Sequence, residues 1–150
     1  MSKNVHDEFI LKGSLSGEKR KMLLGVKVLE WSQLVAGPYC AKLLSDLGAE
    51  VVKIEKPDVG DEARSRGPFV GNITHLEKSL LFLNLNTNKL GVTLDITKSA
   101  DREKFIELIK WADILIEDNP PRVIEDLELS YEELKKLNPS LAMTSIAPFG

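Results

Sequence analysis

Apolar and polar residues follow two different periods along the chain. Residues 26–31 and 50–54 are short runs dominated by valine, leucine and isoleucine, as is typical of strands buried in a parallel sheet. Between them, apolar side chains recur at the spacing of one helical face, namely Cys40, Leu43, Leu44 and Leu47. The pattern predicts a strand–helix–strand unit, whose right-handed crossover is the nucleus of an open parallel sheet.

Proline and glycine mark the two ends of that helix. Pro38 suits the first helical turn, where a missing N–H is harmless, and Gly48 suits the left-handed residue that follows the last turn. The loop before the helix, residues 32–38, lies where a strand ends and a helix begins. Because free backbone N–H groups and the helix dipole favour negative charge, we expect this loop to meet a phosphate or a carboxylate.

The rest of the chain repeats the alternation of strands and helices. We expect strands at 92–96, 114–116 and 141–146, and helices at 99–112, just after 120–121, and at 131–137. Ser99 suits the cap of the first of these helices, and the spacing of Ser130 and Glu133 predicts a capping box for the last. Residues 80–83 fit either a strand or a short helix, and residues 56–75 form an irregular loop of a length that is usually functional or mobile. The order of elements predicts an α/β fold with binding loops along one edge of the sheet.

Composition and charge narrow the class of protein. A chain of 150 residues with 43% hydrophobic residues is expected to form one domain, with residues 1–22 as a tail. With 20 basic against 23 acidic residues, the chain has no basic stripe, so nucleic acid is not expected as a partner. No apolar run suggests a membrane span or a secretory signal, and the single cysteine excludes an internal disulfide. We therefore expect a cytoplasmic protein.

No standard catalytic or metal-binding motif is visible. The glycine-rich dinucleotide fingerprint, the P-loop and the nucleophile elbow are all absent. His6 and His75 have no cysteine or carboxylate at metal-ligand spacing, so no metal is expected. We expect His75 to be a surface residue and Cys40 to be a small core residue, rather than a base and a nucleophile.

Hydrogen-bond donors nevertheless follow the predicted strands. Gln33 and the backbone around Val35 and Ala36 can bind a ligand, and Gly37 allows the backbone to come close to it. Three lysines also lie near strand ends: Lys53, Lys56 and Lys89. Each of them either meets a phosphate or is an ordinary solvated side chain, and the second interpretation is favoured for any one lysine considered alone.

Collinear motifs then indicate a family. The chain reads GVKVLE at 25–30, AGP at 36–38, DLGAEVVKIEKP at 46–57 and GD at 60–61. NTNK at 86–89, ADILIE at 112–117 and LNP at 137–139, followed by Phe149 and Gly150, continue in the same order. Together they resemble the opening of the class III CoA-transferases, the family of formyl-CoA:oxalate and carnitine CoA-transferases that also contains α-methylacyl-CoA racemase. The resemblance covers residues 23–150.

The resemblance implies a Rossmann-like, open and mainly parallel sheet with helices on both faces, as the N-terminal part of the family's large domain. It implies coenzyme A or acyl-CoA as a substrate rather than a permanently bound cofactor, a carboxylic acid as the acceptor, and a homodimer or a paralogous heteromer. Gln33, Val35 and Ala36 would line the thioester end of CoA, Lys56 would meet its phosphates and Lys89 would flank the adenine.

Two departures from the family pattern concern the site. Where the family usually has Glu-Asn-Phe-Arg-Pro-Gly, this chain has Glu117, Asp118 and Asn119 followed by two prolines and an arginine. Asp118 and Asn119 thus replace an asparagine and an aromatic contact to CoA, and Asp126 stands where some members have an arginine. Each extra carboxylate would weaken the binding of a polyanion by about 1 kcal/mol if exposed. The family's nucleophilic aspartate would lie beyond Gly150.

The leading hypothesis is therefore the CoA-binding N-terminal part of a class III CoA-transferase, in which an aspartyl intermediate carries the acyl group and then CoA. The 150-residue chain alone is expected to be inactive, because it lacks the nucleophile. Two alternatives remain open: a non-catalytic subunit of a heteromeric CoA-transferase, and an acyl-CoA racemase of the same family.

Overall fold

The structure, a computed structural model, describes residues 21–148, which form a five-stranded sheet with helices on both faces. Every strand pairing is parallel, and the strand order is β3-β2-β1-β4-β5. The strands are β1 (Lys27–Trp31), β2 (Glu50–Glu55), β3 (Leu90–Thr93), β4 (Ile114–Glu117) and β5 (Ala142–Ser145). The predicted α/β class and parallel sheet are confirmed. Most of the predicted tail, residues 1–20, and the final Phe149 and Gly150 lie outside the described residues.

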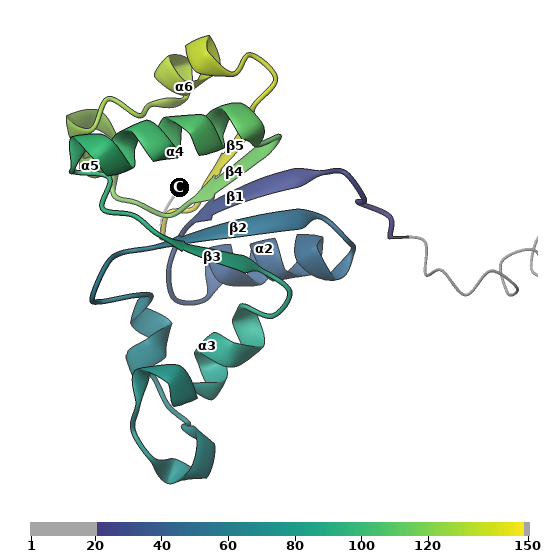
Figure 1. Cartoon of the computed structure of the whole chain (residues 1–150), viewed down its shortest axis with the longest axis vertical. Helices are drawn as coiled ribbons and strands as arrows, with labels where there is room; N and C mark the ends of the chain where they lie inside the picture. The colour runs from purple at the N-terminus through teal and green to yellow at the C-terminus, as the bar shows by residue number, and fades with distance from the viewer. Residues whose placement is uncertain (1–20, 149–150) are drawn as a thin grey trace, which may run out of the picture.

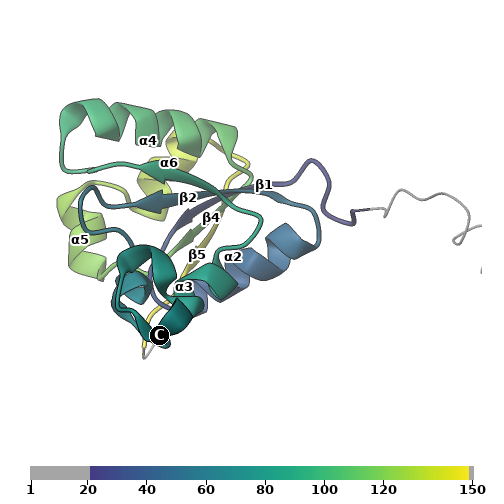
Figure 2. The same cartoon turned by 60° about the horizontal axis from the view of Figure 1, so that its bottom comes forward.

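Helices cover the two faces of the sheet in different ways. Helices α4 (Ser99–Trp111) and α6 (Tyr131–Leu137) lie on one face, and α2 (Ala36–Asp46) lies on the other (Figures 1 and 2). The short α5 (Pro121–Asp126) lies beside the carboxyl ends of the strands (Figure 1). Because side chains alternate along a strand, Leu29 and Val52 face the α4 side, whereas Val28 and Val51 face α2.

Helix α2 differs from its prediction in its start and in its buried face. It begins at Ala36, two residues before the expected start near Pro38. Its fully buried residues are Gly37, Pro38, Ala41 and Ser45, whereas Leu43 and Leu47 are 47% and 44% exposed. Cys40 is partly buried against the α2-side core, in agreement with its prediction. Ala41 belongs to the α2-side core, and Ser45 Oγ donates to the Asn88 carbonyl oxygen at 3.1 Å, so contacts with other elements override the hydrophobic stripe. Gly48 ends the helix at φ +104°, as predicted.

The second half follows the predicted elements with small shifts. The buried residues of α4 include Phe105 and Ile109. Lys98, and not the expected Ser99, occupies the N-cap position, and Ser99 makes no cap. Instead, the Asp101 carboxylate accepts a hydrogen bond from the Asp95 N–H at 3.0 Å. The expected capping hydrogen bond from the Glu133 N–H to Ser130 Oγ is present, at 3.4 Å. The predicted strand at 92–96 lies earlier, at Leu90–Thr93.

Residues between β2 and β3 form an excursion that projects from one end of the molecule (Figure 1). It contains three short 3-10 helices, η1 (Glu62–Ser65), η2 (Val70–Asn72) and η3 (Leu76–Lys78), and then α3 (Leu80–Leu85). The ambiguous run at 80–83 is therefore helical, because Ser79 Oγ caps its first turn by accepting the Phe82 N–H. Arg64 ties this excursion to the end of β2 through two hydrogen bonds to the Glu55 carboxylate, at 2.6 and 2.9 Å.

Candidate functional site

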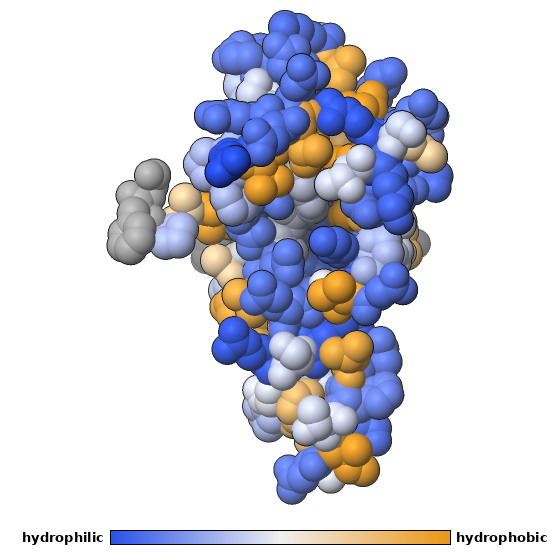
Figure 3. All heavy atoms as spheres, turned by 90° about the vertical axis from the view of Figure 1, so that its left-hand side faces the viewer, coloured by the Kyte–Doolittle hydropathy of each residue, from blue (hydrophilic) through white to orange (hydrophobic). Residues whose placement is uncertain are grey.

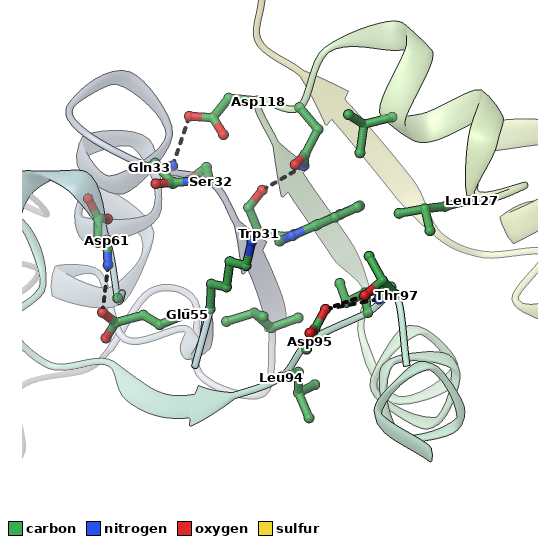
Figure 4. Close-up of a pocket in the computed structure, with 16 residues that line it drawn as sticks. Trp31, Ser32, Gln33, Glu55, Asp61, Leu94, Asp95, Thr97, Asp118 and Leu127 are labelled. Atoms are coloured by element: carbon green, nitrogen blue, oxygen red, sulfur yellow. Dashed lines mark hydrogen bonds between the residues drawn. The ribbon is translucent and has the colours of Figure 1, made fainter. Parts of the chain in front are cut away.

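A cleft opens at the carboxyl ends of the strands. The strand order reverses between β1 and β4, and in open α/β sheets ligands bind at such a switch point. The cleft has a volume of about 240 Å³, and it is lined by the ends of β1 to β4 and by α5. Its lining combines apolar side chains, among them Trp31, Ile54 and Leu94, with the polar Lys56 and Asp118. Figure 4 shows Trp31, Leu94 and Asp118 in this cleft. From this side the surface mixes apolar and hydrophilic side chains (Figure 3).

The loop between β1 and α2, residues 32–35, is called the first loop here. Two carboxylates from other loops hold it in place. The Gln33 N–H donates to Asp118 Oδ2 at 2.8 Å, and the Leu34 N–H donates to Asp61 Oδ1 at 3.0 Å. The sequence predicted that N–H groups of this loop would bind an anionic ligand. Two of them are instead occupied by the chain's own carboxylates.

Gly37 serves the packing of this loop. A Cβ atom on Gly37 would lie 2.1 Å from Ser32 Oγ and 2.3 Å from Ser32 Cβ. The close approach at Gly37 is therefore between the start of α2 and the end of β1, within the chain. The expectation that Gly37 makes room for a ligand is not supported by this geometry.

A buried cluster of four charges lies next to this loop: Glu30, Lys53, Asp61 and Lys89. Glu30 and Lys53 are register partners on β1 and β2, so their side chains point to the same face of the sheet. The Lys53 Nζ contacts Glu30 Oε1, Asp61 Oδ2 and the Ser32 carbonyl oxygen at 2.8, 2.8 and 2.9 Å. The Lys53 ammonium thus donates hydrogen bonds to Glu30 and to the Ser32 carbonyl oxygen and forms an ion pair with Asp61, although the side chain is only 2% exposed.

Lys89 completes the cluster on its other side. Its Nζ contacts Glu30 Oε2 at 2.7 Å, the Pro38 carbonyl oxygen at 2.8 Å and Asn86 Oδ1 at 2.9 Å. Two carboxylates and two ammonium groups give the cluster no net charge. Glu30 Oε2 and Asp61 Oδ2, which accept no directed hydrogen bond, each lie against one of these ammonium groups.

The surroundings shift the pKa values of the two lysines in opposite directions. Burial alone would lower the pKa of Lys53, but the nearby Glu30 and Asp61 carboxylates outweigh it and hold that pKa above its usual value. Burial lowers the pKa of Lys89, and the Glu30 carboxylate offsets this effect only in part. Of the two lysines, Lys53 is therefore the one whose charged form its surroundings favour more.

The three candidate lysines, Lys53, Lys56 and Lys89, differ in their exposure and in their contacts. Lys56 is exposed and lines the cleft, so it is free to meet a ligand. Lys53 is neither solvated nor free for a phosphate, because its ammonium is buried in the charge cluster. The Lys89 side chain is 2% exposed and its hydrogens are used within the chain, so the predicted contact with adenine is not supported by this geometry.

The loop after β4 brings two further candidates into the cleft. Asn119 Nδ2 donates to the Trp31 carbonyl oxygen at 3.2 Å, which ties this loop to the end of β1 (Figure 4). Burial raises the pKa of the Asp118 carboxyl above its usual value, and the Gln33 N–H opposes that shift. Asp126 instead lies outside, 70% exposed and 3.7 Å from Arg122.

Three of the remaining candidates lie in the first loop or directly after it. Gln33, Val35 and Ala36 are all exposed at the end of β1 and the start of α2, although only Gln33 lines the cleft. His75 is exposed, as expected, and its Nδ1 accepts the Glu77 N–H.

Glu30 and Asp61 were not among the predicted site residues. A signal for Glu30 was present, because a charged residue inside each of two apolar strands, Glu30 and Lys53, suggests that the pair meets in the sheet. No local pattern pointed to Asp61, which reaches the cluster from a loop.

The doubly wound parallel sheet with a cleft at its switch point defines a class of ligand-binding α/β proteins. Within that class, CoA-transferase family III matches residues 23–150, and the chain belongs to this family. Succinyl-CoA:mesaconate CoA-transferase of Haloarcula hispanica is 39% identical over 125 residues, which cover 83% of this chain and 31% of that protein. Acetyl-CoA:oxalate CoA-transferase of Acetobacter aceti is 38% identical over 126 residues, covering 84% and 31%.

Solved structures agree with the sequence relatives. Rv3272 from M. tuberculosis, in its orthorhombic form, superposes with a TM-score of 0.75 at 34% identity, covering 85% of this chain and 35% of that one. A CAIB/BAIF family protein from Brucella suis gives a TM-score of 0.73 at 35% identity, covering 82% and 32%. The chain thus spans about a third of the length of the relatives and structures that it matches. Among residues 21–148, no helix has both the length and the apolar character needed to cross a membrane.

Proposed function

We propose that this chain is the N-terminal, CoA-binding part of a class III CoA-transferase. The whole protein would move coenzyme A between an acyl-CoA and a carboxylic acid, through an aspartyl intermediate whose nucleophile lies outside this chain. The observation that carries the proposal is the family match over residues 23–150, together with a cleft at the sheet's switch point.

The residues of the cleft have the chemistry that a CoA ligand requires. Lys56 supplies an exposed positive charge for the phosphates, while Trp31, Ile54 and Leu94 supply apolar lining. Gln33, Val35 and Ala36 would face the thioester end from the first loop, and Asn119 lines the cleft beside Trp31. Asp118 opposes binding of the polyanion, because its carboxylate lies in the same cleft.

The test is calorimetric titration of free coenzyme A into the full-length gene product, followed by a transfer assay with an acyl-CoA and a free acid. We expect micromolar binding and a weaker affinity in Lys56→Gln. The matched control is Lys104→Gln, an exposed lysine on α4 that does not line the cleft. Absence of both CoA binding and transfer would contradict the proposal. The 150-residue chain alone is expected to show no turnover.

A second candidate is a non-catalytic subunit whose paralogous partner supplies the active site. The observation that favours it is Asp118, a carboxylate that lines the cleft and is hydrogen-bonded to the first loop. Failure of the purified full-length protein to bind CoA, together with co-purification of a paralogue, would support this candidate over the transferase. Exchange of the α-proton of an acyl-CoA in heavy water, without transfer, would instead identify a racemase.

A further inference from the structure

The first loop contains a backbone conformation that its residue does not favour. Leu34 has φ +62°, in the left-handed region, where a residue with a Cβ atom is strained. Among the described residues, the other non-glycine residues with positive φ are polar: Asp58, Asn72, Asn88 and Glu128. Strain of this kind persists only where surrounding contacts enforce it, and it clusters at ligand-binding sites.

Asp61 provides the contact that enforces it. Its Oδ1 accepts the Leu34 N–H at 3.0 Å and the Ala63 N–H at 2.7 Å. Its Oδ2 lies 2.8 Å from the Lys53 Nζ. Its own N–H donates to Glu55 Oε2 at 3.0 Å. With 2% of its surface exposed, Asp61 is a buried charge whose position is set from three directions.

Asp118 holds the preceding residue less firmly. Its carboxylate accepts the Gln33 N–H at 2.8 Å, but it is partly exposed and lies on a loop that lines the cleft. Two successive N–H groups of the first loop are therefore bound by carboxylates from two other loops. Of the two contacts, the one to Asp61 is backed by a buried ion pair, so it determines the left-handed conformation of Leu34.

We propose that Asp61 is a positioning residue, which holds Leu34 in its left-handed conformation and thereby orients Gln33, Val35 and Ala36 toward the ligand. The consequence for CoA rests on the proposed function, whereas the effect on the loop conformation does not. The charge cluster then also positions the loop. Lys53, within the cluster, and Glu55, outside it, fix Asp61, and Asp61 fixes the loop.

The test separates conformation from stability by combining two substitutions in the full-length protein. Asp61→Ala removes the acceptor of the Leu34 N–H and leaves Lys53 with one carboxylate. Adding Leu34→Gly removes the steric penalty of positive φ, because glycine adopts that region freely. Adding Leu34→Ala instead keeps a Cβ atom, so it serves as the matched control.

Two readouts are measured on each variant. Amide hydrogen exchange by NMR reports residue 34 directly: we expect exchange to be slow in the unmodified protein and at least tenfold faster in Asp61→Ala, relative to the Ile109 amide in α4. Calorimetry with free CoA is expected to show an affinity about tenfold lower in Asp61→Ala. Leu34→Gly should restore at least half of that loss on a logarithmic scale without restoring the melting temperature, and Leu34→Ala should not.

A distant destabilising variant controls for general loosening of the fold. Asn138 is buried and donates to the carbonyl oxygens of Ile109 and Ala112, at 2.9 and 2.7 Å, on the face of the sheet opposite α2. Asn138→Ala should lower the melting temperature without changing CoA affinity or the relative exchange rate of Leu34.

The outcomes are distinguishable. Equal recovery of affinity with glycine and alanine at position 34, or no recovery with glycine, would overturn the positioning role. Unchanged exchange at Leu34 in Asp61→Ala would do the same. If the unmodified protein binds no CoA while Asp61→Ala speeds the exchange of Leu34, the proposed function fails and the conformational role of Asp61 is supported.

Discussion

The two faces of the sheet are built on different physical principles. The α4 face is packed with a continuous apolar cluster that extends from Leu29 through Phe105 and Ile109 to Leu134 and Leu141. The α2 face has a smaller cluster around Val28 and Val51, and toward the carboxyl ends of the strands it changes to the charge cluster of Glu30, Lys53, Asp61 and Lys89.

In this small domain, different interactions provide stability and position the loops. Apolar contacts are non-directional and stabilise in proportion to the area that they bury. Buried ion pairs contribute little net stability, since desolvation offsets their attraction, but their hydrogen bonds fix angles and distances. The apolar face therefore holds the sheet together, while the charged face determines where the loops at the cleft lie.

The largest effect is expected from Lys53→Met. The substitution keeps most of the side-chain volume but leaves two buried carboxylates, Glu30 and Asp61, without one of their cations. Removing one partner of a buried ion pair destabilises by roughly 3–5 kcal/mol. Chemical denaturation should show a loss of that size. Lys42→Met, which breaks the more exposed pair with Asp46, is the matched control and should change stability by less than about 1 kcal/mol. Similar losses in both would show that the charge cluster has no special role.

A comparable but slightly smaller loss is expected from Ile109→Ala on the opposite face. Ile109 is fully buried, and truncation of a buried isoleucine to alanine costs about 3 kcal/mol. Measuring CoA affinity at a temperature where both Ile109→Ala and Lys53→Met are folded distinguishes the two faces of the sheet. We expect Ile109→Ala to retain its affinity and Lys53→Met to lose it, because only Lys53 contacts the residues that hold the first loop. Equal CoA affinities in the two variants would show that the charge cluster has no special role in positioning the binding loops.

A moderate effect is expected from Asp118→Asn. The amide oxygen can still accept the Gln33 N–H, while one negative charge leaves the cleft. CoA affinity should rise by about 1 kcal/mol, or roughly fivefold, at low ionic strength. Calorimetry at two salt concentrations tests this, since the gain should shrink as salt screens the charge. A weaker affinity in the variant would show that the carboxylate takes part in binding.

Asp118→Asn should also change how the stability of the protein depends on pH. The folded pKa of Asp118 is raised above its ordinary value of 3.8, so the folded state holds this proton more tightly than the unfolded state. Its contribution to stability is therefore fully present below that ordinary value and is lost as pH rises through the raised pKa. The stability of Asp118→Asn relative to the unmodified protein should increase across that window and then stay level. Urea denaturation at a series of pH values measures it.

The smallest effect is expected at Glu55, which joins the excursion to the sheet. Burial would raise the pKa of Glu55, but the hydrogen bonds from Arg64 and from the Asp61 N–H outweigh it and lower that pKa below 4.5. Its stabilisation is present above 4.5 and is lost as pH falls through the lowered pKa. In Glu55→Gln this acid-dependent step should disappear, with a change of less than about 1 kcal/mol at pH 7. An unchanged acid profile in the variant would contradict this role.

Much of the fold could be predicted from local patterns. The strand at 114–116 and the helix at 99–112 are visible because a strand and a helix repeat their apolar residues at different periods. The structure confirmed both within one residue at each end. Errors arose where contacts between elements outweigh local preference. Ala41 and Ser45 are buried in place of Leu43 and Leu47, since Ala41 packs in the α2-side core and Ser45 hydrogen-bonds the turn before β3.

The site was predicted less completely, for the same reason. Lys56, Asp118 and Asn119 line the cleft, because residues that follow parallel strands meet at one edge of the sheet, and their contact with CoA stays a prediction. Lys53 and Lys89 resembled solvated or phosphate-binding lysines, and nothing adjacent to them in the chain showed that both approach Glu30.

The α/β class, the order of the elements and the family can be read from the sequence alone, because periodicity, capping residues and collinear motifs are all properties of neighbouring positions. Three other features depend on packing in three dimensions: β1 lies between β2 and β4, four charges meet beside the first loop, and Asp61 binds the N–H of Leu34. Apart from the contact between Lys53 and Asp61, these features join residues 23 to 86 positions apart. A charged side chain carries no local mark of the distant partner that it will meet.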